Sequence, residues 1–257
     1  MITSMANPRV KLVRELLAKP KVRRREGCFV AEGIRMVAET PEDMLARLFV
    51  SESFLKMTDR HRGLKLDHAE VLSDSVFRQL SDTQTPQGIL AVVRQQLADP
   101  ESLLGGKDPL LMFLENIQDP GNLGTIIRTA EGAGVTGIIM SAGTVDVYNP
   151  KTVRATMGSL YRMPLAVTDD LAGMIRLAAE AGIKSYAAYL GGSVDYAACD
   201  YRQGTAFLIG NEGNGLTQET AAAADVRVHI PMAGSVESLN AAVAAAVLMY
   251  EAARQRR

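Results

Sequence analysis

Arg128 is the side chain best placed to carry chemistry in this sequence, because it stands among polar residues and glycines that core packing does not explain. It belongs to the stretch 116–134, which joins an apolar run at 109–114 to an amphipathic helix. Four apolar residues share one face of that helix: Leu123, Ile126, Ile127 and Ala130. Arg128 points away from this face, above Gly124 one turn earlier. The pattern predicts a permanent cation beside a backbone that a ligand can approach closely.

The turn before this helix also indicates a ligand. Pro120 and Gly121 suit the two central positions of a type II turn, Pro120 by its fixed φ and Gly121 by its tolerance of positive φ. The chain is therefore expected to reverse at the C-terminal end of a strand. Ligands of open α/β sheets bind at that edge.

A second polar segment, 207–217, follows another apolar strand pattern. Three glycines, Gly210, Gly213 and Gly215, bracket Glu212. Glycines allow backbone amides to approach a ligand closely, as a cofactor-binding turn requires. A tight turn into a helix that begins near Thr217 explains the same glycines equally well.

A third segment, 230–240, runs into a helix that is expected to continue to about residue 254. Ser235 or Ser238 is expected to cap this helix, and capping by either serine does not explain Asn240. Unpaired amides and the helix dipole attract electron-rich groups to this first turn. An apolar seam follows, explained either by core burial or by a dimer contact: Leu239, Val243, Ala246 and Tyr250.

The charge distribution points to a polyanionic partner. The 257 residues carry a net charge of -1, yet residues 1–35 hold nine basic and three acidic side chains. A basic arm on a near-neutral protein favours binding to nucleic acid. A solvated basic surface without a partner accounts for the charges equally well.

Several other classes of protein do not fit the composition. Cys28 and Cys199 are too few for a disulfide framework or a cysteine zinc site, which favours a reducing cytoplasm. The longest apolar run, 241–250, is shorter than the roughly 18 residues of a membrane span. The three histidines lack metal-ligand spacing, so we expect no metal site: His61, His68 and His229.

The elements that must position these segments divide into two groups around a linker at 95–109, which is rich in proline, glycine and charge. Before it, the patterns predict a small α/β unit with strands at 28–31, 47–50 and 88–93 and helices at 7–17, 34–40 and 74–80. After it, strands and helices alternate, with strands at 110–115, 137–141, 163–167, 184–190, 205–210 and 226–231. Such alternation predicts a largely parallel sheet covered on both faces. Asn149 and Thr168 are expected to cap helices, and Gly182 to end one.

In their order along the chain, the three polar segments closely resemble the sequence motifs of the SpoU, or TrmH-type, RNA ribose 2′-O-methyltransferases. The matching segments are Asn116-Ile117, Asp119-Pro-Gly-Asn-Leu-Gly124 and Ile127-Arg-Thr-Ala130; Ile209-Gly-Asn-Glu-Gly-Asn-Gly-Leu216; and Ile230-Pro-Met-Ala-Gly-Ser-Val-Glu-Ser-Leu-Asn240. The N-terminal part resembles the substrate-binding domain of the family through Ile2-Thr-Ser4, Asn7-Pro8 and Phe29-Val-Ala-Glu-Gly-Ile-Arg35. The resemblance therefore covers nearly the whole chain.

This resemblance implies an RNA substrate-binding domain at 1–98, a linker at 99–109 and a SpoU-type methyltransferase domain at 110–257. It implies an α/β fold whose mostly parallel C-terminal sheet contains a trefoil knot, and a homodimer. The implied methyl donor is S-adenosylmethionine. The implied acceptor is a ribose 2′-hydroxyl of structured RNA, with ribosomal (23S) RNA as the expected substrate. A tRNA methyltransferase and a non-catalytic RNA-binding or ribosome-assembly factor are the alternatives.

The resemblance also assigns site residues. The implied catalytic group is Asn122, Arg128, Glu212, Ser238 and Asn240. The implied cofactor-binding residues are Ile209, Gly210, Asn211, Gly213, Ile230, Met232 and Leu239. The basic side chains expected to contact RNA are Arg9, Lys11, Arg14, Lys21, Arg23, Arg24, Arg25 and Arg35.

The role of Arg128 is constrained by its acid–base chemistry. The family's corresponding arginine is proposed as a base, yet a guanidinium stays protonated in proteins. We therefore expect Arg128 to position the hydroxyl and an adjacent phosphate, with the proton lost to water or phosphate. Asn122, Ser238 and Asn240 are expected to orient Arg128 and the ribose. Glu212 is expected either to hold the guanidinium or to order the cofactor loop.

Overall fold

The structure, a computed structural model, describes residues 1–57 and 63–257, which form two compact units. Unit 1 comprises 1–95 together with 146–161, and unit 2 comprises 96–145 together with 162–257. The compact units differ from the predicted continuous division in the segment 146–161. Its Tyr148 ring packs on Phe29 with the ring centroids 4.8 Å apart, and both side chains are buried. This apolar contact explains why the segment groups with unit 1.

Unit 1 contains a four-stranded sheet in the order β1-β4-β2-β3. Its strands are β1 (Cys28–Glu32), β2 (Leu45–Ser51), β3 (Glu70–Leu72) and β4 (Ile89–Arg94). The strand β4 is antiparallel to both β1 and β2, whereas β3 is parallel to β2. The predicted small α/β unit is present, although its short strand β3 was not predicted.

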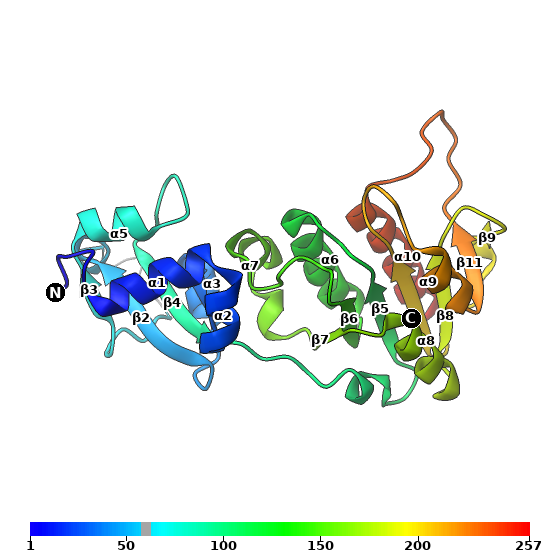
Figure 1. Ribbon diagram of the computed structural model, residues 1–257, viewed down its shortest axis with the longest axis horizontal. Coiled ribbons are helices and arrows are strands. Elements are labelled where there is room, and N and C mark those ends of the chain that lie inside the picture. Colours follow the sequence, from blue (N-terminus) through cyan, green and yellow to red (C-terminus); the bar gives the residue numbers. More distant parts are fainter. Residues whose placement is uncertain (58–62) are drawn as a thin grey trace. The chain divides into compact units, whose positions relative to one another are not determined.

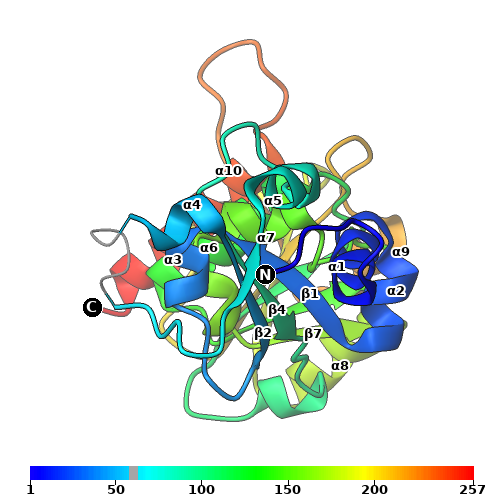
Figure 2. The same cartoon turned by 90° about the vertical axis from the view of Figure 1, so that its left-hand side faces the viewer.

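The helices of unit 1 are α1 (Pro8–Ala18), α2 (Pro20–Glu26), α3 (Ile34–Ala38), α4 (Glu52–Leu55), α5 (Asp74–Leu80) and α7 (Pro150–Thr156), followed by the short 3₁₀ helix η3 (Ser159–Tyr161). Figure 2 shows α1 and α2 beside β1. One face of α1 is buried because Val10, Val13 and Leu16 recur at helical spacing. They share a core cluster with residues of α5 and the sheet.

Unit 2 is built on seven parallel strands in the order β7-β6-β5-β10-β8-β11-β9, of which Figure 1 shows the arrangement. The strands are β5 (Leu110–Leu114), β6 (Gly137–Ser141), β7 (Leu165–Thr168), β8 (Lys184–Ala188), β9 (Val194–Asp195), β10 (Thr205–Ile209) and β11 (Val226–His229). The predicted parallel sheet is confirmed. The trefoil knot stays a prediction that rests on the resemblance.

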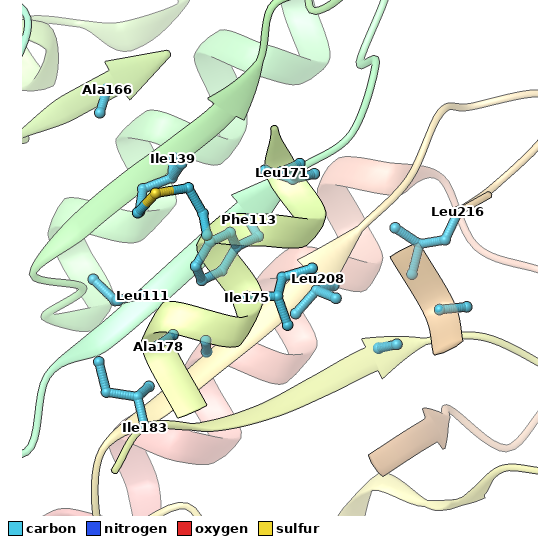
Figure 3. Close-up of a cluster of buried hydrophobic side chains, with 14 residues drawn as sticks. Leu111, Phe113, Ile139, Ala166, Leu171, Ile175, Ala178, Ile183, Leu208 and Leu216 are labelled. Carbon is cyan, nitrogen blue, oxygen red and sulfur yellow. The ribbon is translucent and has the colours of Figure 1, made fainter. Parts of the chain in front are cut away.

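Helices cover both faces of this sheet: η2 (Glu101–Leu104), α6 (Pro120–Ala133), α8 (Leu171–Glu180), η4 (Tyr196–Ala198), α9 (Gln218–Ala223) and α10 (Ala241–Gln255). Figure 3 shows α8 in front of the strands, with α10 behind them. On the α8 side, Ile175 belongs to one buried cluster with Phe113 and Leu208. On the other side, α10 contacts both α6 and β10. Both faces of β5 and β10 are therefore buried.

Helix capping agrees with the sequence in part. Asn149 caps α7 as predicted, and Gly182 follows α8 with a positive φ of 78°. The side chain that caps α8 is Asp170 rather than Thr168, because its carboxylate reaches the N–H of Gly173. The expected linker is partly ordered, since η2 packs Leu103 and Leu104 against the unit 2 core.

The order of the strands determines where the polar segments meet. The strands β5 and β10 are parallel neighbours in register from Leu110 with Thr205 to Leu114 with Ile209. The segments that follow them, 115–119 and 210–217, consequently begin at the same edge of the sheet. The third segment, 230–240, follows β11 and leads into α10.

Candidate active site

Glu212, Asn122 and Asn240 form a hydrogen-bonded network drawn from the three polar segments. Asn122 Nδ2 donates to Glu212 Oε1 over 3.0 Å. Asn240 Nδ2 donates to Asn122 Oδ1, also over 3.0 Å. The three residues are predicted catalytic residues, and the structure brings their polar side chains together at the edge of the sheet.

Asn122 is placed by the start of α6, where the predicted type II turn is wrong. Pro120 is the first residue of the helix, and the Asp119 carboxylate caps it by accepting from the N–H of Asn122 over 2.7 Å. Proline suits this position because its missing N–H has no partner within the helix there and its φ is already helical. Asn122 thus lies in the rigid first turn of a 14-residue helix.

Glu212 also holds the backbone before α6. Its two carboxylate oxygens accept from the N–H groups of Gln118 and Asp119, each over 3.0 Å. Burial alone would raise the pKa of Glu212, but the hydrogen bonds from Asn122, Gln118 and Asp119 keep that pKa below its usual range. The carboxylate is therefore an anchor for the segment 118–122 and a weak base.

Asn240 is itself a helix cap, which corrects the expectation that Ser235 or Ser238 has this role. Asn240 Oδ1 accepts from the N–H groups of Ala242 and Val243, over 2.9 and 3.3 Å. The same amide then has its Nδ2 left to donate to Asn122. One side chain thus starts α10 and joins the network.

A cavity of about 440 Å³ lies beside this network. All seven predicted cofactor-binding residues line it: Ile209, Gly210, Asn211, Gly213, Ile230, Met232 and Leu239. Glu212 and Ser238 line it as well, together with Tyr189 and Glu237. The volume lies within the range of small-molecule sites, and apolar walls with a few polar groups are typical of them.

Gly210 shows why the wall of this cavity needs glycine. A Cβ atom on Gly210 would lie 2.1 Å from both the carbonyl carbon of Gly215 and the N of Leu216. The loop therefore folds back directly onto the backbone of Gly210, and any side chain there would displace it. The tight turn is confirmed, and the same turn lines the cavity, whereas cofactor binding by these glycines stays a prediction.

Two predicted catalytic residues lie outside the hydrogen-bonded network. Ser238 is exposed on the segment before α10, and within the described residues its hydroxyl has no hydrogen-bond partner. Arg128 is exposed on α6 and does not line the cavity. Within the part of the chain that the structure describes, its guanidinium makes no ion pair or hydrogen bond. This cation is thus available to a ligand.

The sequence did not identify the residues that support the network by hydrogen bonds to the surrounding loops. Asn116, the second residue after β5, adopts a left-handed backbone conformation with a φ of 54°. Its carbonyl accepts from Asn211 Nδ2 over 2.9 Å, and its side chain accepts from Ser141 Oγ over 3.0 Å. Asparagine tolerates this conformation better than most residues, which was the available signal. Glu115, immediately before it, is a second buried support.

The basic residues of unit 1 differ in their availability to RNA. Within the described residues, no ion pair engages four exposed side chains: Lys11, Arg14, Lys21 and Arg24. Arg9, Arg25 and Arg35 are also exposed, but each is paired with a glutamate.

Arg23 contradicts its predicted role as an RNA contact. Its side chain is 2% exposed and pairs with Asp146 over 2.7 Å. The guanidinium also donates to the carbonyl oxygens of Leu16 and Leu17, over 2.6 and 3.1 Å. Its donors are thus engaged inside unit 1, and Arg23 serves packing rather than RNA.

Two further features bear on metals and membranes. In residues 1–57 and 63–257, no group of three or more acidic, histidine or cysteine side chains is arranged to hold a metal ion. His229 instead bonds Ser193 over 2.9 Å, and His61 lies outside the described residues. None of the helices that the structure describes is long and apolar enough to cross a bilayer.

Comparisons with known proteins agree with this geometry. Residues 109–250 match the SpoU rRNA Methylase family, and residues 7–91 match an MRM3-like substrate binding domain. The 23S rRNA (guanosine(2553)-2'-O)-methyltransferase RlmP of Bacillus subtilis is 33% identical over 97% of each chain. The 23S rRNA (uridine(2479)-2'-O)-methyltransferase of Streptomyces viridochromogenes is also 33% identical, over 97% of this chain and 91% of its own.

A solved structure of an AdoMet-bound rRNA methyltransferase from Sinorhizobium meliloti has the same fold. It superimposes with a TM-score of 0.85 at 34% identity, covering 98% of this chain and 97% of its own. The fold, the arrangement of the three motifs and the sequence similarity agree over nearly the full length. The chain belongs to the SpoU rRNA methylase family.

Proposed function

We propose that this protein transfers a methyl group from S-adenosylmethionine to a ribose 2′-hydroxyl of 23S ribosomal RNA. The observation that carries the proposal is one juxtaposition: the cavity lined by all seven expected cofactor-binding residues adjoins the Asn122–Glu212–Asn240 network. The relatives described above are named as 23S rRNA 2'-O-methyltransferases, and one structural neighbour is named as AdoMet-bound. A cytoplasmic location follows from this proposed substrate.

The cavity suits a ligand with both apolar and polar parts. Ile209, Leu216 and Leu248 supply apolar wall, whereas Asn211, Glu237 and Ser238 supply polar side chains. At Gly210 the absence of a side chain lets the backbone of Gly215 and Leu216 approach closely, and all three residues line the cavity. When bound, S-adenosylmethionine supplies an activated methyl group on a positively charged sulfur. We assign its binding to Ile209, Gly210, Asn211, Gly213, Ile230, Met232 and Leu239.

The network residues are suited to hold the acceptor rather than to remove its proton. Glu212 is a weak base because its pKa is lowered, and its oxygens already accept from three donors. Asn122 and Asn240 are neutral amides, and each has one Nδ2 hydrogen beyond those used within the network. Such donors can orient a ribose oxygen and stabilise negative charge that develops on it.

Arg128 supplies the positive charge of the proposed mechanism. Its guanidinium stays protonated, and no carboxylate among the described residues neutralises it. It is suited to hold the ribose hydroxyl and a neighbouring phosphate by charge-assisted hydrogen bonds, while water or phosphate takes the proton. Ser238, on the cavity wall, is assigned to the acceptor side of the same site.

The exposed cations of unit 1 provide a docking surface for RNA phosphates. Lys11 and Arg14 lie three positions apart on α1, and Lys21 and Arg24 lie three positions apart on α2. Residues at this spacing share one face of a helix. These four side chains are exposed and are free of ion pairs within the described residues, so phosphate groups do not have to displace an internal partner.

We also infer a homodimer, from an exposed stripe on α10. Val243 and Tyr250 are 48% and 49% exposed, so core burial does not explain the predicted seam. The buried face of the helix is made instead by Ala241, Ala242, Ala245, Leu248, Met249 and Ala252. A Cβ atom on Gly132 would lie 3.3 Å from the Tyr250 hydroxyl, so the stripe extends onto α6. Arg128 lies one turn before Gly132 on the same helical face, beside the proposed interface.

The function is tested with tritium-labelled S-adenosylmethionine and separate samples of 23S rRNA and tRNA. We expect transfer to 23S rRNA, and a loss in kcat of about 100-fold or more in Arg128→Ala, comparable with removal of an oxyanion donor. The control is Arg176→Ala, which removes an exposed arginine from α8. Binding of the donor without transfer to either RNA would favour a non-catalytic RNA-binding protein. Transfer to tRNA alone would overturn the proposed substrate.

A further inference from the structure

Glu115, the residue directly after β5, holds the far end of the loop that lines the cavity. The residue is 6% exposed, and its carboxylate oxygens accept three hydrogen bonds. The donors are the N–H of Thr217 over 2.7 Å, the hydroxyl of Thr217 over 2.8 Å and the hydroxyl of Thr220 over 2.6 Å. All three donors belong to one short segment that directly follows the loop.

The cavity wall ends at this segment, 217–220. Leu216 lines the cavity and Thr217 caps α9, so a displacement of Thr217 moves the wall. The near end of the loop is held by Asn211, whose Nδ2 donates to the carbonyl of Asn116. Glu115 and Asn116 are consecutive residues. Two adjacent positions after β5 therefore fix both ends of the loop.

The chemistry of the contact favours a role beyond capping a short helix. Within the described residues, Glu115 has no cationic partner, so a buried carboxylate is balanced by neutral donors alone. A buried charge is costly unless several hydrogen bonds satisfy it. The Thr217 hydroxyl already caps α9 by accepting from the N–H of Thr220, so Glu115 is not itself the cap. The Glu115 carboxylate here joins the end of β5 to the start of α9.

We propose that Glu115 is a positioning residue for the methyl-donor site, a role that rests on the proposed function. By fixing Thr217, it sets the return of the chain against Gly210 and hence the shape of the wall at 210–216. Glu115 does not line the cavity, so it acts through the loop rather than on the ligand. Its loss is expected to weaken binding of the donor more than it weakens folding.

The test compares Glu115→Ala with Glu115→Gln and a matched control in the full chain. Glutamine keeps an acceptor for the Thr217 N–H, and its amide can donate to the threonine hydroxyls. The control is Asp225→Ala, since Asp225 similarly holds the N–H and hydroxyl of Ser185 over 2.8 and 2.7 Å but does not line the cavity. For each protein, calorimetry gives the Kd for S-adenosylmethionine and thermal unfolding gives Tm.

We expect Glu115→Ala to raise the Kd about tenfold or more, as expected for loss of a hydrogen bond to a charged group. Glu115→Gln should recover most of the affinity, and Asp225→Ala should lower Tm with an unchanged Kd. If Glu115→Ala does not fold, Thr220→Val is used instead, because it removes one of the hydrogen-bond donors to Glu115. It should raise the Kd for S-adenosylmethionine about threefold.

If the folded variant binds S-adenosylmethionine with the same Kd as the parent, the role of Glu115 is overturned and the proposed function is left intact. Failure of the parent itself to bind S-adenosylmethionine would instead overturn the proposed function, and the role of Glu115 with it. A fall in Tm alone is the result expected of a residue that merely caps α9.

Discussion

Asn240 donates from its Nδ2 to Oδ1 of Asn122 over 3.0 Å, although the two residues are 118 positions apart in the chain. The same Asn240 side chain caps α10 through its Oδ1. The two functions of this amide use different atoms. They can therefore be separated by substitution.

Asn240→Asp is expected to keep the cap and lose the link to Asn122. Aspartate offers an acceptor to the N–H groups of Ala242 and Val243, but has no hydrogen to donate to Asn122. We expect Tm to stay close to that of the parent and kcat to fall about tenfold, the equivalent of one hydrogen bond. Asn240→Ala should lose the cap as well, at about 1 kcal/mol of folding free energy. Full activity in Asn240→Asp would show that the pair does not orient the site.

Glu212 gives a prediction about pH. Burial opposes ionisation, but the hydrogen bonds from Asn122, Gln118 and Asp119 lower the pKa of Glu212 below its usual range. A carboxyl of this kind stabilises the folded state at pH values above its ordinary pKa, and its contribution is lost as the pH falls through the lowered value.

The measurement is the difference in Tm between the parent and Glu212→Gln, from about pH 3 to about pH 8. We expect the parent to be the more stable near neutral pH, with the difference shrinking only below the ordinary pKa. A difference that disappears between about pH 6 and about pH 5 would contradict the hydrogen-bonded arrangement.

The sequence predicted those strands whose burial leaves a continuous apolar run. The strands β5 and β10 are apolar along their whole length because helices cover both faces of the sheet, so they were recognised. The strands β3 and β9 have three and two residues, too few for any periodicity. The helix α2 was missed because its sequence is mainly basic and it has only two buried residues.

The candidate site was predictable in residue type but not in its contacts. The resemblance named Asn122, Glu212 and Asn240, yet no local pattern relates side chains that are 90 and 118 positions apart. In the sequence Glu115 looks like the end of an apolar strand, since its two partners, Thr217 and Thr220, lie more than 100 positions away. The burial of Arg23 was also hidden, because its partner Asp146 lies 123 positions later.

Substitutions of neighbouring basic residues on α2 are expected to separate effects on RNA affinity from effects on folding stability. Lys21→Ala combined with Arg24→Ala removes two exposed cations, so the affinity for 23S rRNA should fall. The slope of log affinity against log salt should decrease by about one for each phosphate that the variant no longer neutralises. Lys19→Ala is the control, because Lys19 already pairs with Glu15. An unchanged salt slope in the double variant would exclude this surface from RNA binding.

Arg23→Ala is expected to lower folding stability and to leave the salt dependence of RNA binding unchanged. It leaves Asp146 without its buried partner, a change that typically costs about 3–5 kcal/mol of folding free energy. Chemical denaturation should show the loss, while any protein that stays folded should keep the salt slope of the parent. A normal unfolding free energy together with a reduced salt slope would show instead that Arg23 contacts RNA.

The exposed stripe on α10 predicts the oligomeric state. A stable interface buries about 800 Å² on each partner and is enriched in aromatic residues, which suits the exposed Tyr250 on the same face of α10 as Val243. The double variant Val243→Glu and Tyr250→Glu places like charges on both partners and should sediment as a monomer. Val167→Glu is the control, because Val167 is 41% exposed on β7, away from α10. A parent that sediments as a monomer at the concentrations of the methylation assay would refute the dimer. A double variant that still sediments as a dimer would place the interface elsewhere.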